Sequence, residues 1–230
     1  MGTLYIVATP IGNLEDVSLR ALRVLKEVDF VLCEDTRVTR KLLSHYEIHT
    51  PTLSYHQHST EKEMARVFDL LSQGKNIALV SDAGTPGISD PGNELIAFLI
   101  KRSSELKIIP IPGPSALTAG ASIAGFPMDK FLFLGFPPHK KKRRKFFEEI
   151  AQSQYPVIFY ESPYRIIKSL SELSSILNTR YKIQDTRIVV CRELTKKFET
   201  VYRGTIEKVL EQLHTGKVRG EFVVVAYQEK

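Results

Sequence analysis

A glycine-rich loop with an acid is the stretch of this chain whose residue types and spacing most suggest chemistry. Residues 81–92 contain Asp82, three glycines and two prolines, with no lysine. Glycine lets a ligand approach the backbone closely, and proline fixes the path of the chain. An acid without a lysine favours a cationic or neutral ligand over a bare triphosphate, although backbone amides can also hold an anion. The common phosphate-loop patterns GxxxxGK(S/T) and GxGxxG are absent.

This loop is expected to join a buried strand to a helix. Residues 76–80 form a short, β-rich apolar run that is typical of a buried parallel strand. Asp90 is placed to cap the next helix, and Pro91 to be its first residue. Open parallel sheets bind ligands outside the carboxyl ends of their strands, so the loop lies where a ligand site is expected. The alternative interpretation is an ordinary turn.

A second group of charged residues follows the apolar run 30–33. Glu34, Asp35 and Arg37 could provide a base and a cation that positions a substrate. They could equally begin a helix and form a surface ion pair, and without context this second interpretation is favoured. The charges of residues 192–199 are ambiguous in the same way, because they could line a cleft or face water.

No metal site or activated nucleophile is predicted. His45 and His49 have helical spacing, and His56 and His58 follow, but no HExxH motif or cysteine partner accompanies them, and Pro51 separates the two pairs. The GxSxG elbow of the α/β-hydrolases is absent as well.

Composition indicates a globular protein. With 230 residues, 43% of them hydrophobic, the chain can form one large domain or two small ones. Cys33 and Cys191 are far apart and lack CxxC spacing, so we expect buried free thiols. No apolar stretch is long enough to span a bilayer, and no secretion signal is expected. These features favour a cytoplasmic protein.

The positive charge is concentrated in one block. The formal net charge is +6, and the basic block, which we define as residues 139–145, can account for the whole excess. The block favours contact with a nucleic acid or another polyanion, although it could be only a solvated helix start. The residues expected to contact RNA are Lys140, Lys141, Lys142, Arg143, Arg144 and Lys145.

The order of apolar runs predicts an α/β fold with two αβ domains, at 1–112 and 113–230. In the first half, strands alternate with helices, which is the signature of a mainly parallel sheet; these strands are expected at 3–8, 30–33, 52–56, 76–80 and 107–112. The second half predicts a mixed sheet, with strands at 131–136, 157–160, 187–191, 200–203 and 222–227 and helices at 142–151, 164–177 and 206–214. Ligand sites favour such a domain junction.

Six stretches of sequence carry a family resemblance, in order over essentially the whole chain. They are LYIVATPIGNLED at 4–16, CEDTR at 33–37, the loop at 81–92, PGPSA at 112–116, FYESP at 159–163 and RELTK at 192–196. Together they resemble the tetrapyrrole methylase-like family of S-adenosylmethionine-dependent enzymes, and within it the branch that methylates small-subunit ribosomal RNA.

The resemblance implies a homodimer of two-domain αβ subunits that binds S-adenosyl-L-methionine in a cleft between the domains. It implies methylation of the ribose 2'-hydroxyl of a cytidine in the decoding region of bacterial small-subunit ribosomal RNA, either free or in the assembled subunit. No metal is required. The positions that match the family's cofactor contacts are Pro10, Asp82, Ala83, Gly84, Thr85, Gly87, Ile88, Ser115, Ala116, Tyr160, Leu194 and Phe222.

A role for the second charged group follows from this resemblance. A ribose hydroxyl is a weak nucleophile, and we hypothesise that Asp35 or Glu34 accepts its proton while Arg37 holds a phosphate of the target nucleotide. Two other functions stay open. A tetrapyrrole C-methyltransferase would use the same fold, and a non-catalytic RNA-binding factor for ribosome assembly would need no cofactor cleft.

Overall fold

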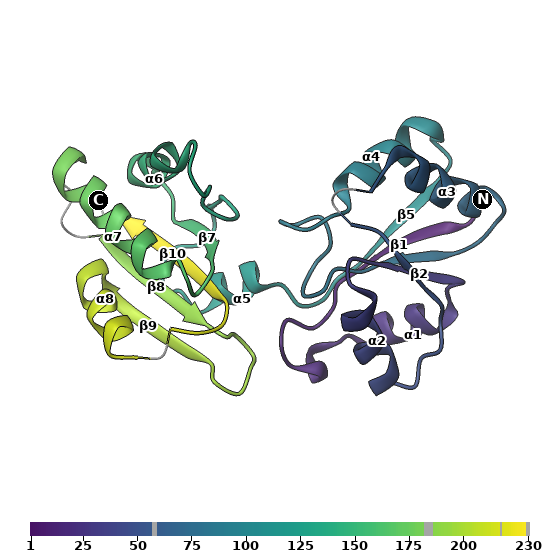
Figure 1. Ribbon diagram of the computed structural model, residues 1–230, viewed down its shortest axis with the longest axis horizontal. Helices are drawn as coiled ribbons and strands as arrows, with labels where there is room; N and C mark the ends of the chain where they lie inside the picture. Colours follow the sequence, from purple (N-terminus) through teal and green to yellow (C-terminus); the bar gives the residue numbers. More distant parts are fainter. Residues whose placement is uncertain (57–58, 182–185, 217, 229–230) are drawn as a thin grey trace. The chain divides into compact units, whose positions relative to one another are not determined.

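The chain forms two compact units, Met1–Ser115 (unit 1) and Ala116–Lys230 (unit 2). The computed structural model describes residues 1–56, 59–181, 186–216 and 218–228, and Figure 1 shows the helices and strands of both units. Among the described residues, no helix combines the length and apolar character needed to cross a bilayer.

Unit 1 is built on a five-stranded sheet with the order β3-β2-β4-β1-β5, in which every pair of neighbours is parallel. Its strands are β1 (Thr3–Val7), β2 (Phe30–Cys33), β3 (Thr52–Ser54), β4 (Ile77–Leu79) and β5 (Lys107–Ile111). Its helices are η1 (Leu14–Asp16), α1 (Leu19–Glu27), α2 (Thr36–His45), α3 (Glu61–Ser72) and α4 (Asn93–Arg102). The predicted parallel sheet is therefore confirmed.

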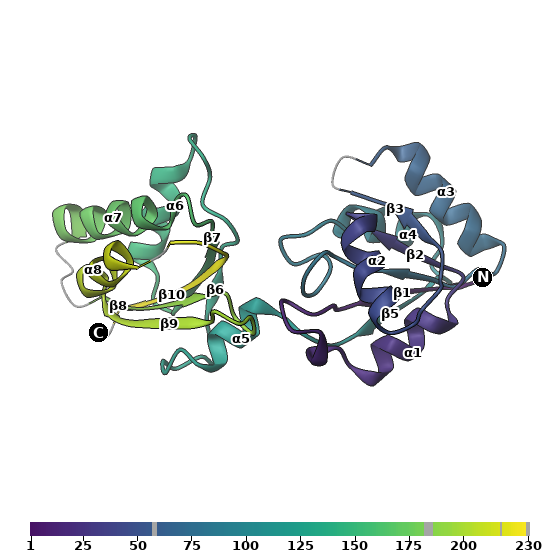
Figure 2. The same ribbon diagram turned by 60° about the horizontal axis from the view of Figure 1, so that its bottom comes forward.

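Two separate clusters of buried side chains cover the two faces of this sheet. Leu25 of α1 and Leu43 of α2 pack with Val7 in one cluster, while Leu71 of α3 and Leu99 of α4 pack in the other. Alternate residues of β1 point to opposite faces, as the pleat of a strand requires. Figure 2 gives a second view of these helices around the sheet.

Unit 2 holds a mixed sheet with the order β6-β7-β10-β8-β9, in which β6 and β7 are parallel and the other pairs antiparallel. This confirms the mixed character that the sequence predicts. Its strands are β6 (Leu132–Phe133), β7 (Val157–Glu161), β8 (Thr186–Arg192), β9 (Thr200–Thr205) and β10 (Phe222–Gln228). Its helices are α5 (Ala116–Ser122), α6 (Arg143–Gln152), α7 (Ile166–Ile176), the π-helical η2 (Leu177–Tyr181) and α8 (Ile206–Thr215).

The core of unit 2 lies between the sheet and three helices. Side chains of α6, α7 and α8, among them Phe147, Leu170 and Val209, pack in one cluster with Phe159 and Val224 of the sheet. Helix α5 lies against β10 from the other face, where a Cβ at Gly120 would stand 2.8 Å from Val223 Cγ1. A small residue at position 120 therefore allows close packing of helix and strand.

Three local expectations differ from the structure. Helix α4 begins at Asn93 after Gly92, so the expected cap at Asp90 is wrong; the Asp90 carboxyl instead pairs with Ser81. Strand β6 has two residues where six were expected, because Gly135 turns away with a φ of 64°. Helix α2, which apolar periodicity predicts only from Thr39 to His45, begins at Thr36 because Asp35 caps it, and this confirms the interpretation of Glu34, Asp35 and Arg37 as a helix start.

Candidate functional site

Loops after β1 and β4 are joined at the carboxyl edge of the unit 1 sheet. The Thr9 amide donates to the Gly84 carbonyl at 2.9 Å, and the Gly84 amide donates back to Thr9 at 3.0 Å. The buried Thr9 hydroxyl donates to the Ser81 carbonyl at 3.0 Å, and the Ser81 hydroxyl donates to the Gly84 carbonyl at 3.2 Å. These four hydrogen bonds fix Pro10, which follows Thr9, beside the glycine-rich loop.

The loop after β5 joins the same edge. The Thr85 hydroxyl donates to the Pro114 carbonyl at 3.2 Å. A Cβ at Gly113 would lie 3.1 Å from the Ala8 Cβ, so the loop after β5 and the loop after β1 approach each other closely. Pro10, residues 82–88 and Ser115, which the family resemblance assigns to the cofactor, thus lie on three loops at one edge of the sheet.

Two glycines give the central loop a path that other residues would strain. Gly84 has a φ of 91° and Gly87 a φ of 82°, in the left-handed region that only glycine enters without cost. A Cβ at Gly87 would also stand 2.8 Å from the Asn93 Oδ1 atom. The bent path of this loop therefore depends on glycine at both positions.

Acids dominate the charge at this edge. The Asp82 carboxylate accepts a hydrogen bond of 3.2 Å from the Asp35 amide, which connects the ends of β2 and β4. Asp90 is half-buried, and burial raises its pKa to about 6, with the charges of Glu34 and Asp82 adding to the effect and the Ser81 hydrogen bond opposing it. Such a setting favours a cation and disfavours a phosphate.

Asp35 and Arg37 form a bidentate ion pair. Arg37 Nη2 lies 2.7 Å from Asp35 Oδ2, and Arg37 Nε lies 3.1 Å from Asp35 Oδ1. The Arg37 side chain and the Arg37 amide hold the pKa of the Asp35 carboxyl at about 2. A carboxyl so stabilised as an anion is a weak proton acceptor. Glu34, next to it, is exposed.

A cavity of about 310 Å³ opens beside the glycine-rich loop. Tyr55, Gly87, Asp90 and Glu94 are among its lining residues. Burial is the main cause that raises the pKa of the Tyr55 hydroxyl, and Glu94 adds to it. The cavity places the half-buried carboxyl of Asp90, which was expected only to cap a helix, beside space that a small molecule can enter.

The chemistry of this edge fits S-adenosylmethionine. The cofactor carries a sulfonium and an ammonium group, and the described part of the 81–92 loop offers Asp82 and Asp90 without a basic side chain. Pro10, Asp82 and Ser115 are among the residues of this edge that would hold the cofactor.

Unit 2 gathers its own predicted contacts at one end of its sheet. Phe222, the first residue of β10, pairs with Glu161 of β7 and with Arg192 of β8. Tyr160 directly precedes Glu161 on β7, and Leu194 follows Arg192 by two residues. The side chains of Phe222 and Leu194 are buried. Ala116 begins α5 in the same unit.

The basic block divides into exposed and buried residues. Lys140, Lys141, Lys142, Arg144 and Lys145 are exposed. Arg143, however, is only 7% exposed, so the expectation that it contacts RNA is wrong. Its side chain is engaged in a buried polar network at the start of α6.

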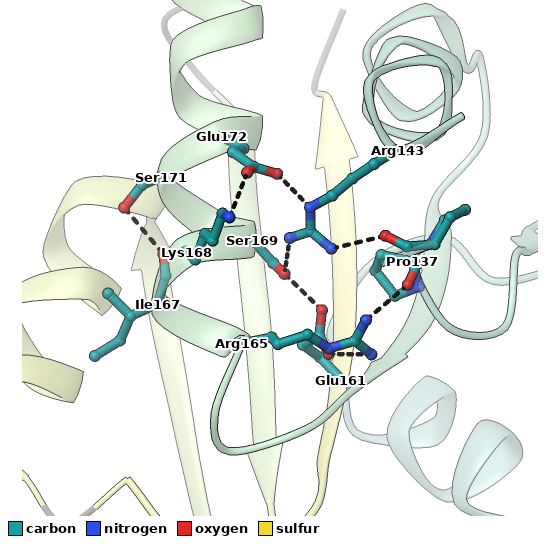
Figure 3. A network of polar contacts seen from close by, with 10 residues as sticks. Pro137, Arg143, Glu161, Arg165, Ile167, Lys168, Ser169, Ser171 and Glu172 are labelled. Carbon is teal, nitrogen blue, oxygen red and sulfur yellow. Dashed lines mark hydrogen bonds and ion pairs between the residues drawn. The ribbon is translucent and has the colours of Figure 1, made fainter. Parts of the chain in front are cut away.

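Figure 3 shows that network around Arg143. The Arg143 guanidinium donates to Glu172 at 2.6 Å, to the Ser169 hydroxyl at 2.7 Å and to the Pro138 carbonyl at 3.2 Å. Ser169 in turn donates to Glu161 at 2.5 Å, and Arg165 Nη2 lies 2.8 Å from the same carboxylate. All three donor nitrogens of Arg143 are thus satisfied inside the unit.

Sequence reasoning misses two kinds of site residue. The hydroxyls of Thr9 and Ser81 connect the loops, yet nothing in their spacing shows that they are buried. Glu161 stands at the end of an apolar run and was not singled out, although its i, i+4 spacing to Arg165 is a usable signal. Among the described residues no three metal-ligating side chains are grouped, and His58 lies outside that part of the chain.

Comparison with known proteins matches this architecture to one family. The family model for Tetrapyrrole (Corrin/Porphyrin) Methylases matches residues 3–210. Among solved structures, cobalt precorrin-4 methyltransferase aligns with a TM-score of 0.70 and 20% identity, over 97% of this chain and 94% of that one. Diphthine synthase aligns with a TM-score of 0.71 and 14% identity, over 97% and 89%. At these identities the solved structures support the fold alone. The match of the family model to residues 3–210 shows that the chain belongs to the tetrapyrrole methylase family.

Relatives of higher identity bear a different name. A protein of Halalkalibacterium halodurans named ribosomal RNA small subunit methyltransferase I is 46% identical over 97% of this chain and 75% of its own length. The protein of that name from Thermotoga maritima is 40% identical over 98% of both chains. Both identities far exceed those of the solved structures, and both alignments run through the two units.

Proposed function

We propose that this protein transfers a methyl group from S-adenosyl-L-methionine to the ribose 2'-hydroxyl of a cytidine in the decoding region of small-subunit ribosomal RNA. The observation that carries the proposal is the near full-length identity of 40–46% to proteins named as methyltransferases of small-subunit ribosomal RNA. The acid-lined, glycine-bent edge of unit 1 supports the choice of cofactor. The net charge of +6 supports an RNA substrate.

The protein's main task in this reaction is positioning. When bound, S-adenosylmethionine supplies a methyl group on a positively charged sulfur, which needs no metal for activation. Three joined loops of unit 1 would hold the donor still, and a fixed line between the hydroxyl oxygen and the methyl carbon lowers the barrier through orientation. We propose that Tyr160, Leu194, Phe222 and Ala116 of unit 2 complete the cofactor contacts.

The proton of the 2'-hydroxyl needs an acceptor. Of the two acids proposed for this role, Glu34 is the better candidate, because Asp35 is held by Arg37 at a pKa of about 2. Arg37 keeps an 85% exposed side chain and is suited to hold a phosphate of the target nucleotide. Asp35 then acts by fixing the guanidinium.

The decisive assay follows a labelled methyl group into three acceptors: assembled small subunits without the modification, their naked RNA, and a porphyrinogen. We expect label in RNA, recovered as 2'-O-methylcytidine by nuclease digestion and mass spectrometry. Label in the porphyrinogen alone would identify a tetrapyrrole C-methyltransferase. Calorimetry with S-adenosylmethionine tests the third function, since an assembly factor without catalysis would not bind it.

The proton acceptor is tested by a matched pair of substitutions. Glu34→Gln should lower kcat by about 100-fold or more and leave cofactor affinity within about twofold. Glu61→Gln, at an acid that is 77% exposed on α3, serves as the control and should behave as wild type. Equal turnover of both variants would remove Glu34 from the mechanism and leave the methyltransferase assignment intact.

Three broader features belong to the same proposal. We expect a homodimer, to be measured by sedimentation. We expect each unit to act as a domain and the cofactor to bind between them, which cross-linking of a photoreactive cofactor analogue to peptides of both units would establish. We expect a cytoplasmic protein, because the proposed substrate is ribosomal RNA.

A further inference from the structure

The buried network of unit 2 fixes two surface loops next to each other. Arg165, in the loop after β7, donates from Nη1 to the Pro137 carbonyl at 3.0 Å, and Arg143 donates from Nη1 to the Pro138 carbonyl at 3.2 Å. Arg165 pairs directly with the fully buried Glu161 side chain, and Arg143 is connected to the same carboxylate through Ser169. Figure 3 shows Pro137, Arg143 and Arg165 converging around Glu161. The segment before α6 and the loop after β7 are therefore held as one rigid surface.

This rigid surface presents aromatic rings to solvent. Tyr164, the neighbour of Arg165, is 95% exposed, and Phe136, the neighbour of Pro137, is 52% exposed. The Phe136 ring is steadied by an edge contact with Tyr160, with centroids 5.4 Å apart. A tyrosine with almost no buried area adds little to the packing of unit 2, so its role lies outside the fold.

The segment that carries Phe136 also carries lysines. Lys140, Lys141 and Lys142 follow Pro137 and Pro138 and are exposed. Within the described part of the chain, none of the three takes part in an ion pair. Lysines without an ion-pair partner and exposed aromatic rings are the elements with which proteins bind single-stranded nucleic acid.

We propose that Phe136, Lys140, Lys141, Lys142 and Tyr164 form a stacking surface for an unpaired RNA strand that flanks the target nucleotide. A base stacks on the Tyr164 ring, and the lysines contact the adjoining phosphates. The identity of the strand as RNA rests on the proposed function. A duplex would keep its bases stacked on one another and offer Tyr164 no free face, so the surface selects unpaired RNA.

A single introduced indole provides the direct test. The chain contains no tryptophan, so Tyr164→Trp places one fluorophore on the surface. Tyr155→Trp is the matched control, since Tyr155 is 47% exposed and precedes β7, whereas Tyr164 follows the other end of that strand. Each variant is titrated with a 12-nucleotide RNA without self-complementarity, with the corresponding RNA duplex, and with heparin.

We expect the single-stranded RNA to quench the indole fluorescence of Tyr164→Trp by about half or more, as base stacking on an indole does, and that of Tyr155→Trp by little. Duplex RNA and heparin should leave the fluorescence of Tyr164→Trp nearly unchanged. Three results would each overturn the proposal: equal quenching of Tyr164→Trp by the duplex, equal quenching of the two variants, or no quenching of Tyr164→Trp while filter binding detects the RNA.

Methylation of small subunits supplies a second readout. Tyr164→Ala should lower kcat/KM by about tenfold or more, mainly through KM, while keeping cofactor affinity, and Tyr164→Phe should restore most of the loss because the ring remains. If wild type methylates RNA but both variants match each other, the stacking surface is wrong and the proposed function stands. If wild type methylates no RNA, the proposed function fails instead. If Tyr164→Ala splits a dimer, the surface is a contact between subunits and the inference fails.

Discussion

Substitution of Arg143 should mainly lower the stability of unit 2, whereas substitution of its neighbour Arg144 should mainly weaken RNA binding. Arg143→Ala removes the partner of Glu172 and Ser169 in a buried network. Breaking a buried ion pair from one side costs about 3–5 kcal/mol, and because Glu172 keeps a 33% exposed side chain, we expect the lower limit, about 3 kcal/mol. Arg144→Ala breaks an ion pair whose arginine is 75% exposed, and should cost less than about 1 kcal/mol.

Hydrogen exchange in unit 2 measures this difference directly. The exchange of amides in β7 and α7 is followed by mass spectrometry at low urea concentrations. The structure around these amides should open about 100-fold more often in Arg143→Ala than in wild type, which is the loss of about 3 kcal/mol expressed as an equilibrium constant. Arg143→Lys should lie between Arg143→Ala and wild type, since one ammonium nitrogen cannot take the places of the three guanidinium nitrogens that bond Glu172, Ser169 and Pro138.

RNA binding should show the reverse order. Arg144→Ala should reduce the slope of log affinity against log salt by about one, as the loss of one phosphate contact does, while Arg143→Lys should leave the slope unchanged. The reasoning is refuted if Arg143→Ala and Arg144→Ala destabilise unit 2 equally, or if Arg143→Lys changes the salt slope as much as Arg144→Ala does.

Three further variants test the edge of unit 1 and the basic block. The pKa of Asp90 is about 6 in the folded chain against 3.8 for the free group, so its ionisation destabilises the fold as pH rises through this range. Asp90→Asn should therefore be more stable than wild type by about 1 kcal/mol at pH 8 and equal to it below pH 4 in urea unfolding. Gly84→Ala forces a side chain into a φ of 91° and should weaken S-adenosylmethionine binding by about tenfold in calorimetry; unchanged affinity would remove this loop from the site. Replacing Lys140, Lys141 and Lys142 together by alanine should lower the RNA salt slope by about two to three without changing cofactor affinity, and equal loss of both would indicate misfolding.

Regular elements are predictable where their patterns are long. The alternation of strands and helices in unit 1 indicates its parallel sheet, and the spacing of Thr60 and Glu63, which form a capping box, is a usable signal for the start of helix α3 (Glu61–Ser72). Short apolar runs are less informative. Residues 131–136 are apolar like a strand, yet only Leu132–Phe133 forms one. The chain turns at Gly135, which has a φ of 64°, and hydrophobicity does not indicate such a turn.

Burial of polar residues is the main obstacle at the candidate site. Arg143 is predicted to contact RNA because it stands among six other basic residues, yet its spacing to Phe146, Phe147 and Ile150 continues the buried stripe of α6. The apolar spacing of α6 can be read from the sequence, but the six neighbouring basic residues lead to the prediction that Arg143 is exposed. Asp90 precedes a helix and therefore resembles a cap, and its pairing with Ser81 depends on a loop path that only coordinates reveal.

Each unit of this protein is one uninterrupted stretch of chain, and each sheet takes all its strands from a single unit. A cut between Ser115 and Ala116 would thus leave every strand pair intact, and each fragment would keep its own apolar core. We expect the halves to be producible as separate polypeptides, which makes the molecule a natural starting point for a split enzyme whose activity returns only on reassociation.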